Sequence, residues 1–162
     1  MRMFFVLVLI FSLGFSQPHS KVVETPYQKP FKAVFWLFLE SPERLKLSLG
    51  FISNIMYVLT NSPYNFSLDD IDIVVVSHGR EVPVFAYKNK ELYSELVDRA
   101  EILSLYGVKF KICRVAAEQV YGLSEKDFYP FVELVPSAIT EVIHWQMQGH
   151  AIIIPPGRHT PP

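Results

Sequence analysis

One stretch of the sequence decides the fold: Gly107-Val108-Lys109-Phe110-Lys111-Ile112-Cys113-Arg114-Val115-Ala116-Ala117. Apolar and basic residues alternate from Val108 to Ile112, with the period of two that is typical of a strand. Gly107 is suited to end a preceding helix, and a new helix is predicted to begin among the alanines. A helix, a strand and a further helix in this order are typical of a parallel α/β sheet.

Cys113, the only cysteine in the chain, stands where this predicted strand ends. In parallel α/β sheets, ligands and reactive groups gather at the carboxyl ends of the strands. A helix N-terminus and the adjacent Arg114 would both favour a thiolate at this position. Cys113 is therefore a candidate reactive thiol. The alternative is a small buried apolar residue whose chemistry is irrelevant, and the local pattern leaves both interpretations open.

The rest of the chain repeats the same alternation of strands and helices. Four further apolar runs have the length and composition of strands: 33–39, 71–76, 131–135 and 151–154. Helical patterns separate them, from Ser41-Pro42 to about Leu59, from Asn89 to Gly107, and from Pro136 to Gly149. The sequence therefore predicts a three-layer α/β/α sandwich with a five-stranded, largely parallel sheet and right-handed crossovers.

The first sixteen residues have the pattern of a cleavable signal peptide. Arg2 precedes an apolar run at 3–11, and the small residues Gly14 and Ser16 then have the spacing of a cleavage site. The run is shorter than the roughly 20 residues of a membrane span, so no stable span is expected after processing; a retained anchor is the alternative. We expect a periplasmic or secreted protein. There, a cysteine without a partner in the chain points to intermolecular pairing or a free reactive thiol.

The remaining boundaries follow from composition. Residues 17–30 are polar and proline-containing and are predicted to form a leader arm, 31–155 the α/β domain, and 156–162 a proline-rich tail.

The net charge is −1 and no basic run is present, so nucleic acid is not an expected partner. The sequence contains no phosphate-binding loop, dinucleotide fingerprint or Gly-x-Ser-x-Gly motif, so no nucleotide cofactor is predicted. Glu141 and His144 have the spacing of a di-iron ligand pair, but such sites need it twice, so no metal is predicted.

A second group of residues that could take part in catalysis or binding follows the predicted strand at 71–76, in the segment Ser77-His78-Gly79-Arg80. His78 and Arg80 would lie at a strand's carboxyl end, as Cys113 does. An imidazole can take the proton of a thiol, so a Cys–His pair is chemically sensible. The alternative is a loop histidine and a solvated arginine. The candidate site residues are therefore Cys113, His78 and Arg80.

The predicted helices also carry information about burial. The first helix has two apolar stripes, one of Leu45, Leu49, Ile52, Met56 and Leu59, the other of Leu47, Phe51, Ile55 and Val58. One stripe can cover the sheet, whereas the second needs another neighbour, in the chain or in another subunit. The second helix is expected to bury one face, made of Leu92, Leu96, Ala100, Leu103 and Tyr106.

Three segments together resemble the DsrE/DsrF-like family of sulfur-relay proteins, to which the small YchN-like α/β proteins belong. They are 74–79, 107–113 and a block at 135–141 that continues in Trp145-Gln146 and at 149–152. The resemblance covers about Lys32 to Pro155. It implies a small α/β/α sandwich that forms homotrimers or homohexamers, and it implies a persulfide on Cys113.

Two functional hypotheses follow. In the first, the protein is an exported sulfur carrier or sulfurtransferase-like protein, whose Cys113 accepts a sulfane sulfur and passes it to a partner. His78 and Arg80 would then polarise or position the incoming group. In the second, it is a non-catalytic oligomeric module that binds a small molecule or a protein, and Cys113 is structural. Neither hypothesis requires a cofactor. Solvent access at Cys113 favours the first, and burial favours the second.

Overall fold

The computed structural model describes residues 19–156. Within that range five strands form one sheet in the order β4-β3-β2-β1-β5, and every neighbouring pair is parallel. The predicted five-stranded α/β fold is therefore confirmed. The predicted signal peptide and residues 157–162 lie outside the described residues. The strands are β1 (Phe31–Leu37), β2 (Ile71–Ser77), β3 (Lys109–Cys113), β4 (Val132–Val135) and β5 (Ala151–Ile153).

Three longer helices and several short turns of helix connect these strands. The α-helices are α1 (Leu45–Thr60), α2 (Lys90–Leu105) and α3 (Ala138–Met147). A π-helix, η5, spans Ala116–Val120 directly after β3. The 3₁₀ segments are η1 (Pro42–Arg44), η2 (Leu68–Asp70), η3 (Val82–Phe85), η4 (Tyr87–Asn89) and η6 (Glu125–Asp127).

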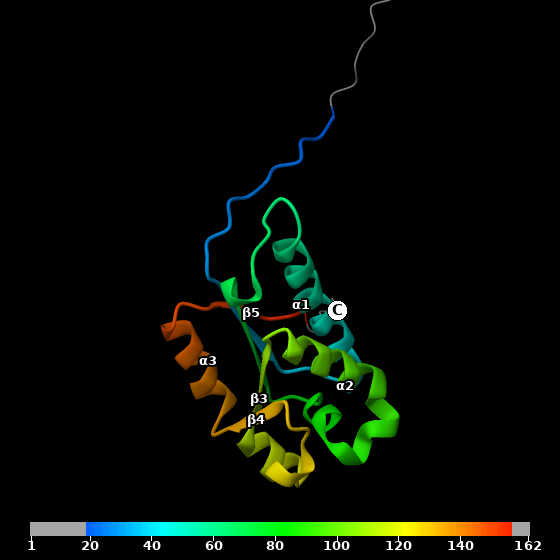
Figure 1. Ribbon diagram of the computed structural model, residues 1–162. Helices are drawn as coiled ribbons and strands as arrows, with labels where there is room; N and C mark the ends of the chain where they lie inside the picture. The colour runs from blue at the N-terminus through cyan, green and yellow to red at the C-terminus, as the bar shows by residue number, and fades with distance from the viewer. Residues whose placement is uncertain (1–18, 157–162) are drawn as a thin grey trace, which may run out of the picture.

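The helices cover both faces of the sheet, as Figure 1 shows, with α3 on one side and α1 and α2 on the other. Alternate residues of each strand point to opposite faces, so the sheet separates two cores. The larger core, against α1 and α2, contains Phe35, Phe85 and Phe110. The smaller core, under α3, consists of Val34, Val74, Val76, Cys113, Ala116, Ala138 and Val142, with Trp36 and Trp145 packed against it.

The first strand begins and ends two residues earlier than the sequence predicted. Phe31 and Lys32 already pair with β2, which lengthens the strand at its start. At its end, Phe38 is 72% exposed. The backbone N–H of Leu39 donates to the Glu81 side chain in the turn after β2. The side chain of Phe38 therefore lies on the surface, whereas Leu39 is buried in the α1–α2 core although it stands beyond the end of the strand.

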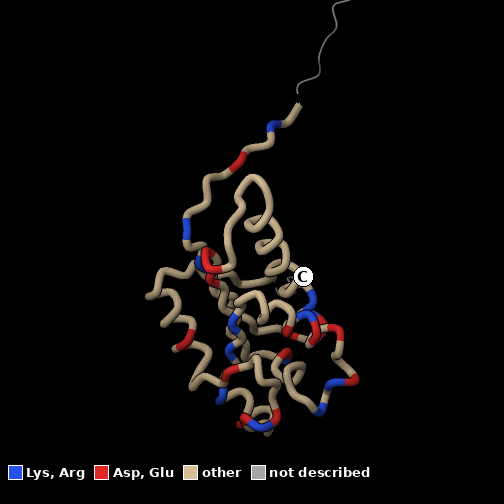
Figure 2. The backbone as a smooth tube through the Cα atoms, viewed as in Figure 1, with Lys and Arg blue, Asp and Glu red and all other residues tan. Residues whose placement is uncertain are grey.

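The first helix buries one of its two predicted stripes. Leu45, Leu49, Ile52, Met56 and Leu59 are buried against the sheet, and burying each such side chain contributes roughly 1.5–3 kcal/mol. Of the second stripe, Leu47 and Phe51 are 47% and 38% exposed. No charged residue occurs from Leu47 to Leu68, and Figure 2 shows this stretch as an uninterrupted uncharged segment. Helix α1 thus presents an uncharged, partly apolar outer face.

The prediction for the second helix was wrong at its two ends. Leu92 is 71% exposed and Tyr106 is also exposed, whereas Leu96, Val97, Ala100 and Leu103 are buried. The reason at the start is a kink at Tyr93, whose φ of −126° and ψ of 23° are not helical. The kink rotates the first turn relative to the rest, so that the 3.6-residue period does not carry through it. At the other end, Tyr106 follows the last helical residue as the C-cap.

Candidate functional site at the carboxyl edge of the sheet

The candidate site lies where β1, β2 and β3 end. Because the sheet is parallel, these three carboxyl ends share one edge. Ser77 pairs with Leu37 on one side and with Ile112 on the other. His78 and Cys113 are therefore the next residues on neighbouring strands, and both follow residues that face the α1–α2 core. The fold thus brings two of the three predicted site residues to adjacent strand ends on the α3 side.

A buried carboxylate shapes the turn after β2. Glu81 is fully buried, and its Oε1 accepts hydrogen bonds from the Ser77 hydroxyl (2.6 Å) and from the backbone N–H groups of His78 (3.1 Å) and Gly79 (2.9 Å). Its Oε2 accepts the Leu39 N–H at 2.9 Å. A buried charge is tolerated only when it is fully hydrogen-bonded, and these donors meet that condition. Glu81 therefore fixes the ends of β1 and β2 relative to each other.

Gly79 is required by this close approach. A Cβ atom at this position would overlap the Leu39 amide nitrogen, the Glu81 carboxylate and the Phe38 carbonyl carbon. The backbone of the turn is further tied to β1 and its extension, because the His78 N–H donates to Leu37 O (3.1 Å) and the Arg80 N–H to Leu39 O (3.0 Å). The turn that carries His78 and Arg80 is thus rigid at its backbone.

The His78 ring is held by aromatic neighbours. The Trp36 Nε1–H donates to His78 Nε2 over 2.6 Å, and the planes of the two rings are inclined by only 16°. The Phe38 ring stacks on His78 with centroids 4.8 Å apart. Because the indole N–H can only donate, Nε2 must be the unprotonated nitrogen, and the neutral ring carries its proton on Nδ1. Burial lowers the pKa of His78, and the Glu81 charge opposes this effect.

Arg80 and His78 line one pocket, which we name the strand-end pocket. It has a volume of about 670 Å³ and is lined by Phe38, Leu39, Glu40, His78, Gly79, Arg80, Val120 and Tyr121. Tyr121, which follows η5, donates its hydroxyl proton to Gly79 O at 2.9 Å. Burial and the Glu81 charge raise the pKa of Tyr121, so its hydroxyl stays protonated. A neighbouring pocket of about 470 Å³ shares Phe38, Leu39 and His78 and extends to Trp36, Ile154 and Pro155.

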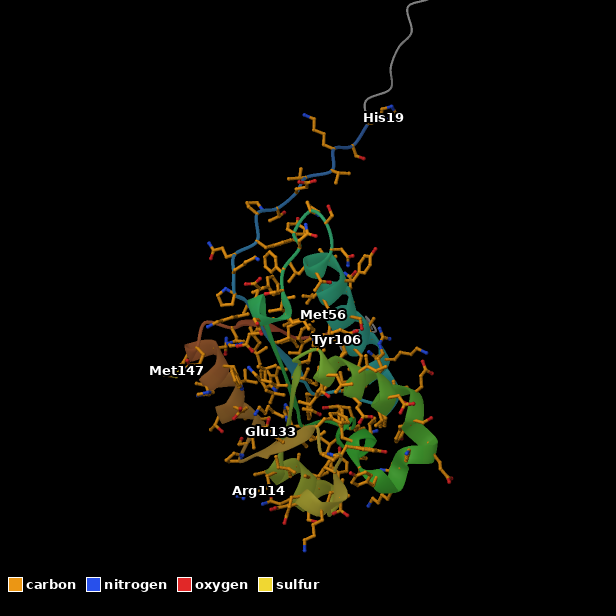
Figure 3. The ribbon with its side chains drawn as sticks, viewed as in Figure 1. His19, Met56, Tyr106, Arg114, Glu133 and Met147 are labelled. Carbon is orange, nitrogen blue, oxygen red and sulfur yellow. The ribbon has the colours of Figure 1, made fainter. Side chains whose placement is uncertain are left out.

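Cys113 lies close by but outside both pockets. It is 6% exposed and belongs to the apolar core under α3. Within residues 19–156 no hydrogen bond joins it to His78, and the proton-accepting nitrogen of His78 is occupied by Trp36. Arg114 is exposed at this end of the molecule, visible in Figure 3, and its Nε lies 3.9 Å from Glu118 Oε1. The π-helix that follows is a rare form of helix that is frequent at functional sites.

The sequence did not indicate Trp36, Glu81 or Tyr121 as site residues. In the sequence, Trp36 is one of several apolar residues of a predicted strand, and Tyr121 stands at the end of a short predicted helix. Glu81 carries the only available signal, because it is an acidic residue directly before the apolar segment Val82–Phe85. That position is consistent with a buried carboxylate, but its donors come from residues that are distant in the sequence.

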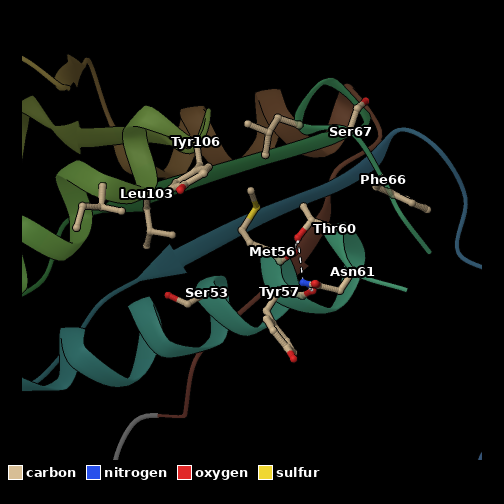
Figure 4. A pocket seen from close by; sticks show the side chains of 11 residues that line it. Ser53, Met56, Tyr57, Thr60, Asn61, Phe66, Ser67, Leu103 and Tyr106 are labelled. Atoms are coloured by element: carbon tan, nitrogen blue, oxygen red, sulfur yellow. Dashed lines mark hydrogen bonds between the residues drawn. The ribbon is translucent and has the colours of Figure 1, made fainter. Parts of the chain in front are cut away.

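A third pocket lies at the opposite end of the sheet, between the C-terminal halves of α1 and α2. Figure 4 shows Met56 of α1 and Leu103 and Tyr106 of the α2 end around this space of about 560 Å³. No charged residue lines it. Two of its polar side chains already donate within their own segment, Thr60 to Met56 O and Asn61 to Tyr57 O. This pocket suits an uncharged apolar group and has no part in chemistry at the carboxyl edge.

Within residues 19–156, no group of three or more His, Cys, Asp or Glu side chains is placed to hold a metal ion. Glu141 instead accepts a hydrogen bond from Trp145 Nε1 at 2.8 Å. Among the same residues, no helix combines the length and the apolar character that crossing a membrane requires.

Fold and site together define a three-layer α/β/α protein with a ligand-sized pocket at the carboxyl edge of its parallel sheet. A model of the DsrE/DsrF-like family matches residues 32–155, and the chain belongs to this family. Among solved structures it is similar to MTH1491 from Methanobacterium thermoautotrophicum, a protein of unknown function, with a TM-score of 0.63 and 23% identity. That match covers 77% of this chain and 99% of the other, and at this identity it shows the fold alone. No curated protein matches the chain.

Proposed function

We propose that the protein is a sulfur carrier of the DsrE/DsrF-like family, in which Cys113 accepts a sulfane sulfur and passes it to a partner. The position of Cys113 carries this proposal: it ends β3, is next in register to His78, and is followed directly by a helical segment that includes η5. Family membership supports it. We include in the proposal that the chain is exported, which the mass of a mature chain beginning at Gln17 would check.

The transfer consists of two sulfur displacements. The Cys113 thiolate attacks the outer sulfur of a polysulfide, a new S–S bond forms at Sγ, and the old S–S bond breaks. The bonding electron pair leaves with the shortened polysulfide, so no external oxidant or reductant is needed. An acceptor thiolate then attacks the outer sulfur of the persulfide and restores the Cys113 thiolate.

In this proposal His78 does not act as the base. Its Nε2 is bound to the Trp36 N–H, so the ring can offer only the Nδ1–H as a donor. Arg80 supplies a positive charge in the same pocket as His78. Their role is to attract and orient a negatively charged donor or leaving group near the end of β3.

One observation favours a second function, that of a binding module with a structural cysteine. Cys113 is buried among small apolar side chains, and neither of the two pockets beside it includes it. Sulfur transfer would need a local movement that opens the α3 side of the sheet or η5. A binding module needs no such movement, because the strand-end pocket is already open.

Mass spectrometry after incubation with polysulfide separates the two functions. For a carrier we expect one added sulfur atom on the intact chain, removed by dithiothreitol. Since Cys113 is the only cysteine, Cys113→Ser and Cys113→Ala should both lose the addition. Cys113→Ala is the better matched variant, because it places no hydroxyl in the apolar core. A folded wild-type protein that takes up no sulfur would favour the binding module.

A further inference from the structure

The strand-end pocket contains a positive charge that is not neutralised. Arg80 forms no ion pair with any residue in the described range 19–156, although its backbone N–H is anchored to Leu39 O. Glu40 is the single acidic residue that lines the pocket. A fixed backbone with an available guanidinium is a suitable receptor for a planar oxyanion, because the guanidinium fork matches a carboxylate in geometry.

His78 adds a second donor of defined position. With Nε2 occupied by Trp36, its proton is on Nδ1, and Nδ1 has no hydrogen-bond partner among residues 19–156. The ring borders the pocket and is held by the Phe38 stack as well as by Trp36. A hydrogen-bond donor that is fixed in this way before binding costs little entropy when a ligand arrives.

The remaining wall of the pocket is apolar and open to solvent. Phe38 is 72% exposed, and Val120 is exposed on the η5 side. Exposed apolar side chains beside a cation and a neutral donor favour a ligand with one charged end and a flat apolar body. The charges around the pocket also limit the ligand: Arg80 is the one cation of the lining, against the acidic Glu40 and the Glu81 carboxylate buried beneath the turn, so a ligand with a single negative charge suits it better than a phosphate dianion.

We propose that the strand-end pocket binds a small organic monoanion, a carboxylate with a planar apolar body, and that Trp36 is a positioning residue that holds His78 as a donor to it. The carboxylate accepts from Arg80 and from His78 Nδ1–H, while the body of the ligand packs on Phe38 and Val120. The proposal goes beyond sulfur transfer and does not depend on it, because Cys113 does not line this pocket.

Benzoate, with benzamide and inorganic phosphate as comparison probes, tests the ligand class. We expect benzoate to shift the NMR signals of His78 and Arg80 and to bind more tightly than benzamide, which lacks the charge, and than phosphate. Cys113→Ala should bind benzoate as the wild type does, which separates this result from any failure of the sulfur-carrier function. Equal affinity for benzoate and benzamide, tighter binding of phosphate, or no shift at His78 and Arg80 would each overturn the proposal.

Two arginine variants test the receptor. Arg80→Gln should weaken benzoate binding by about tenfold or more, since a hydrogen bond to a charged group contributes roughly 1.5–3 kcal/mol. Arg114→Gln is the matched control, because Arg114 is exposed at the same end of the sheet but outside the pocket. It should bind as the wild type does. Unchanged binding in Arg80→Gln, or an equal loss in both variants, contradicts the assignment.

The ¹⁵N spectrum of the histidine ring tests the positioning role of Trp36 directly. The wild type should show a protonated Nδ1 and an unprotonated Nε2 at His78. Trp36→Phe keeps an aromatic ring but removes the N–H, so the Nε2–H form should become populated and benzoate affinity should fall. A wild-type ring with its proton on Nε2 would refute the proposal even if Trp36→Phe did not fold. An unchanged tautomer in a folded Trp36→Phe protein would refute it equally.

Discussion

Gly79 limits what the candidate site can tolerate at the scale of a single residue. Gly79→Ala should destabilise the protein by about 2 kcal/mol or more, because the added methyl group overlaps backbone and carboxylate atoms that cannot move independently. Gly50→Ala is the control, since its Cβ would meet nothing closer than Arg99 Nη2 at 4.0 Å. Because Gly50 lies within α1, where alanine is the better helix former, Gly50→Ala should raise the free energy of unfolding by about 0.5–1 kcal/mol. Urea unfolding of both variants measures the contrast, and a shift of the same sign in both would contradict it.

At the scale of elements, η2 fastens the N-terminal arm to the sheet. Asp70 Oδ2 accepts from Lys29 Nζ of the arm (2.8 Å) and from the N–H (2.9 Å) and hydroxyl (2.8 Å) of Ser67. The Lys29 ammonium also lies 4.4 Å from the centre of the Phe66 ring. The hydrogen bond from Lys29, and then those from Ser67, lower the pKa of Asp70 from 3.8 to about 2.

The shift in the pKa of Asp70 predicts a pH dependence. Because the pKa is lower in the folded state, the ionised carboxylate stabilises the protein fully above pH 3.8, and this contribution is lost as the pH falls towards about 2. Asp70→Asn should therefore lower the urea midpoint at neutral pH, and the difference from wild type should vanish near pH 2. Asp69→Asn, at an exposed position of the same turn, should match the wild type throughout. A difference that persists unchanged at low pH would contradict the ion pair as its cause.

At the scale of the whole molecule, the outer face of α1 is where we expect another subunit. Leu47 and Phe51 are exposed on a helix that carries no charge beyond Lys46, whereas exposed helices normally carry charged residues on their outer face. We expect a homotrimer or a multiple of it by light scattering. Phe51→Glu should shift the mass to the monomer. Leu92→Glu, on the exposed and charged start of α2, should leave it unchanged. A monomeric wild-type protein at micromolar concentration would refute this expectation.

The order and type of the main elements could be predicted from the sequence because they depend on local patterns. Alternation at 108–112, continuous apolar runs elsewhere, and Gly107 before the third strand are enough to predict five strands and the helices between them. The same local patterns predicted that His78 and Arg80 lie at the end of a strand, on the carboxyl edge that parallel strands share. It failed at Leu92 because a kink at Tyr93 interrupts the helical period, and a kink of this kind has no signal in the local pattern.

By itself, then, the sequence determined the layers of this protein, its sheet and the edge at which its polar residues gather. The tertiary structure alone decided what those residues can do. The Trp36–His78 hydrogen bond and the Glu81–Leu39 hydrogen bond each join residues 42 positions apart, so the tautomer of His78 and the rigidity of its turn depend on how β1 pairs with β2. The burial of Cys113 likewise depends on α3 packing over its face of the sheet. Burial and hydrogen-bond partners are set by neighbours in space, and for these residues the neighbours are distant in the chain.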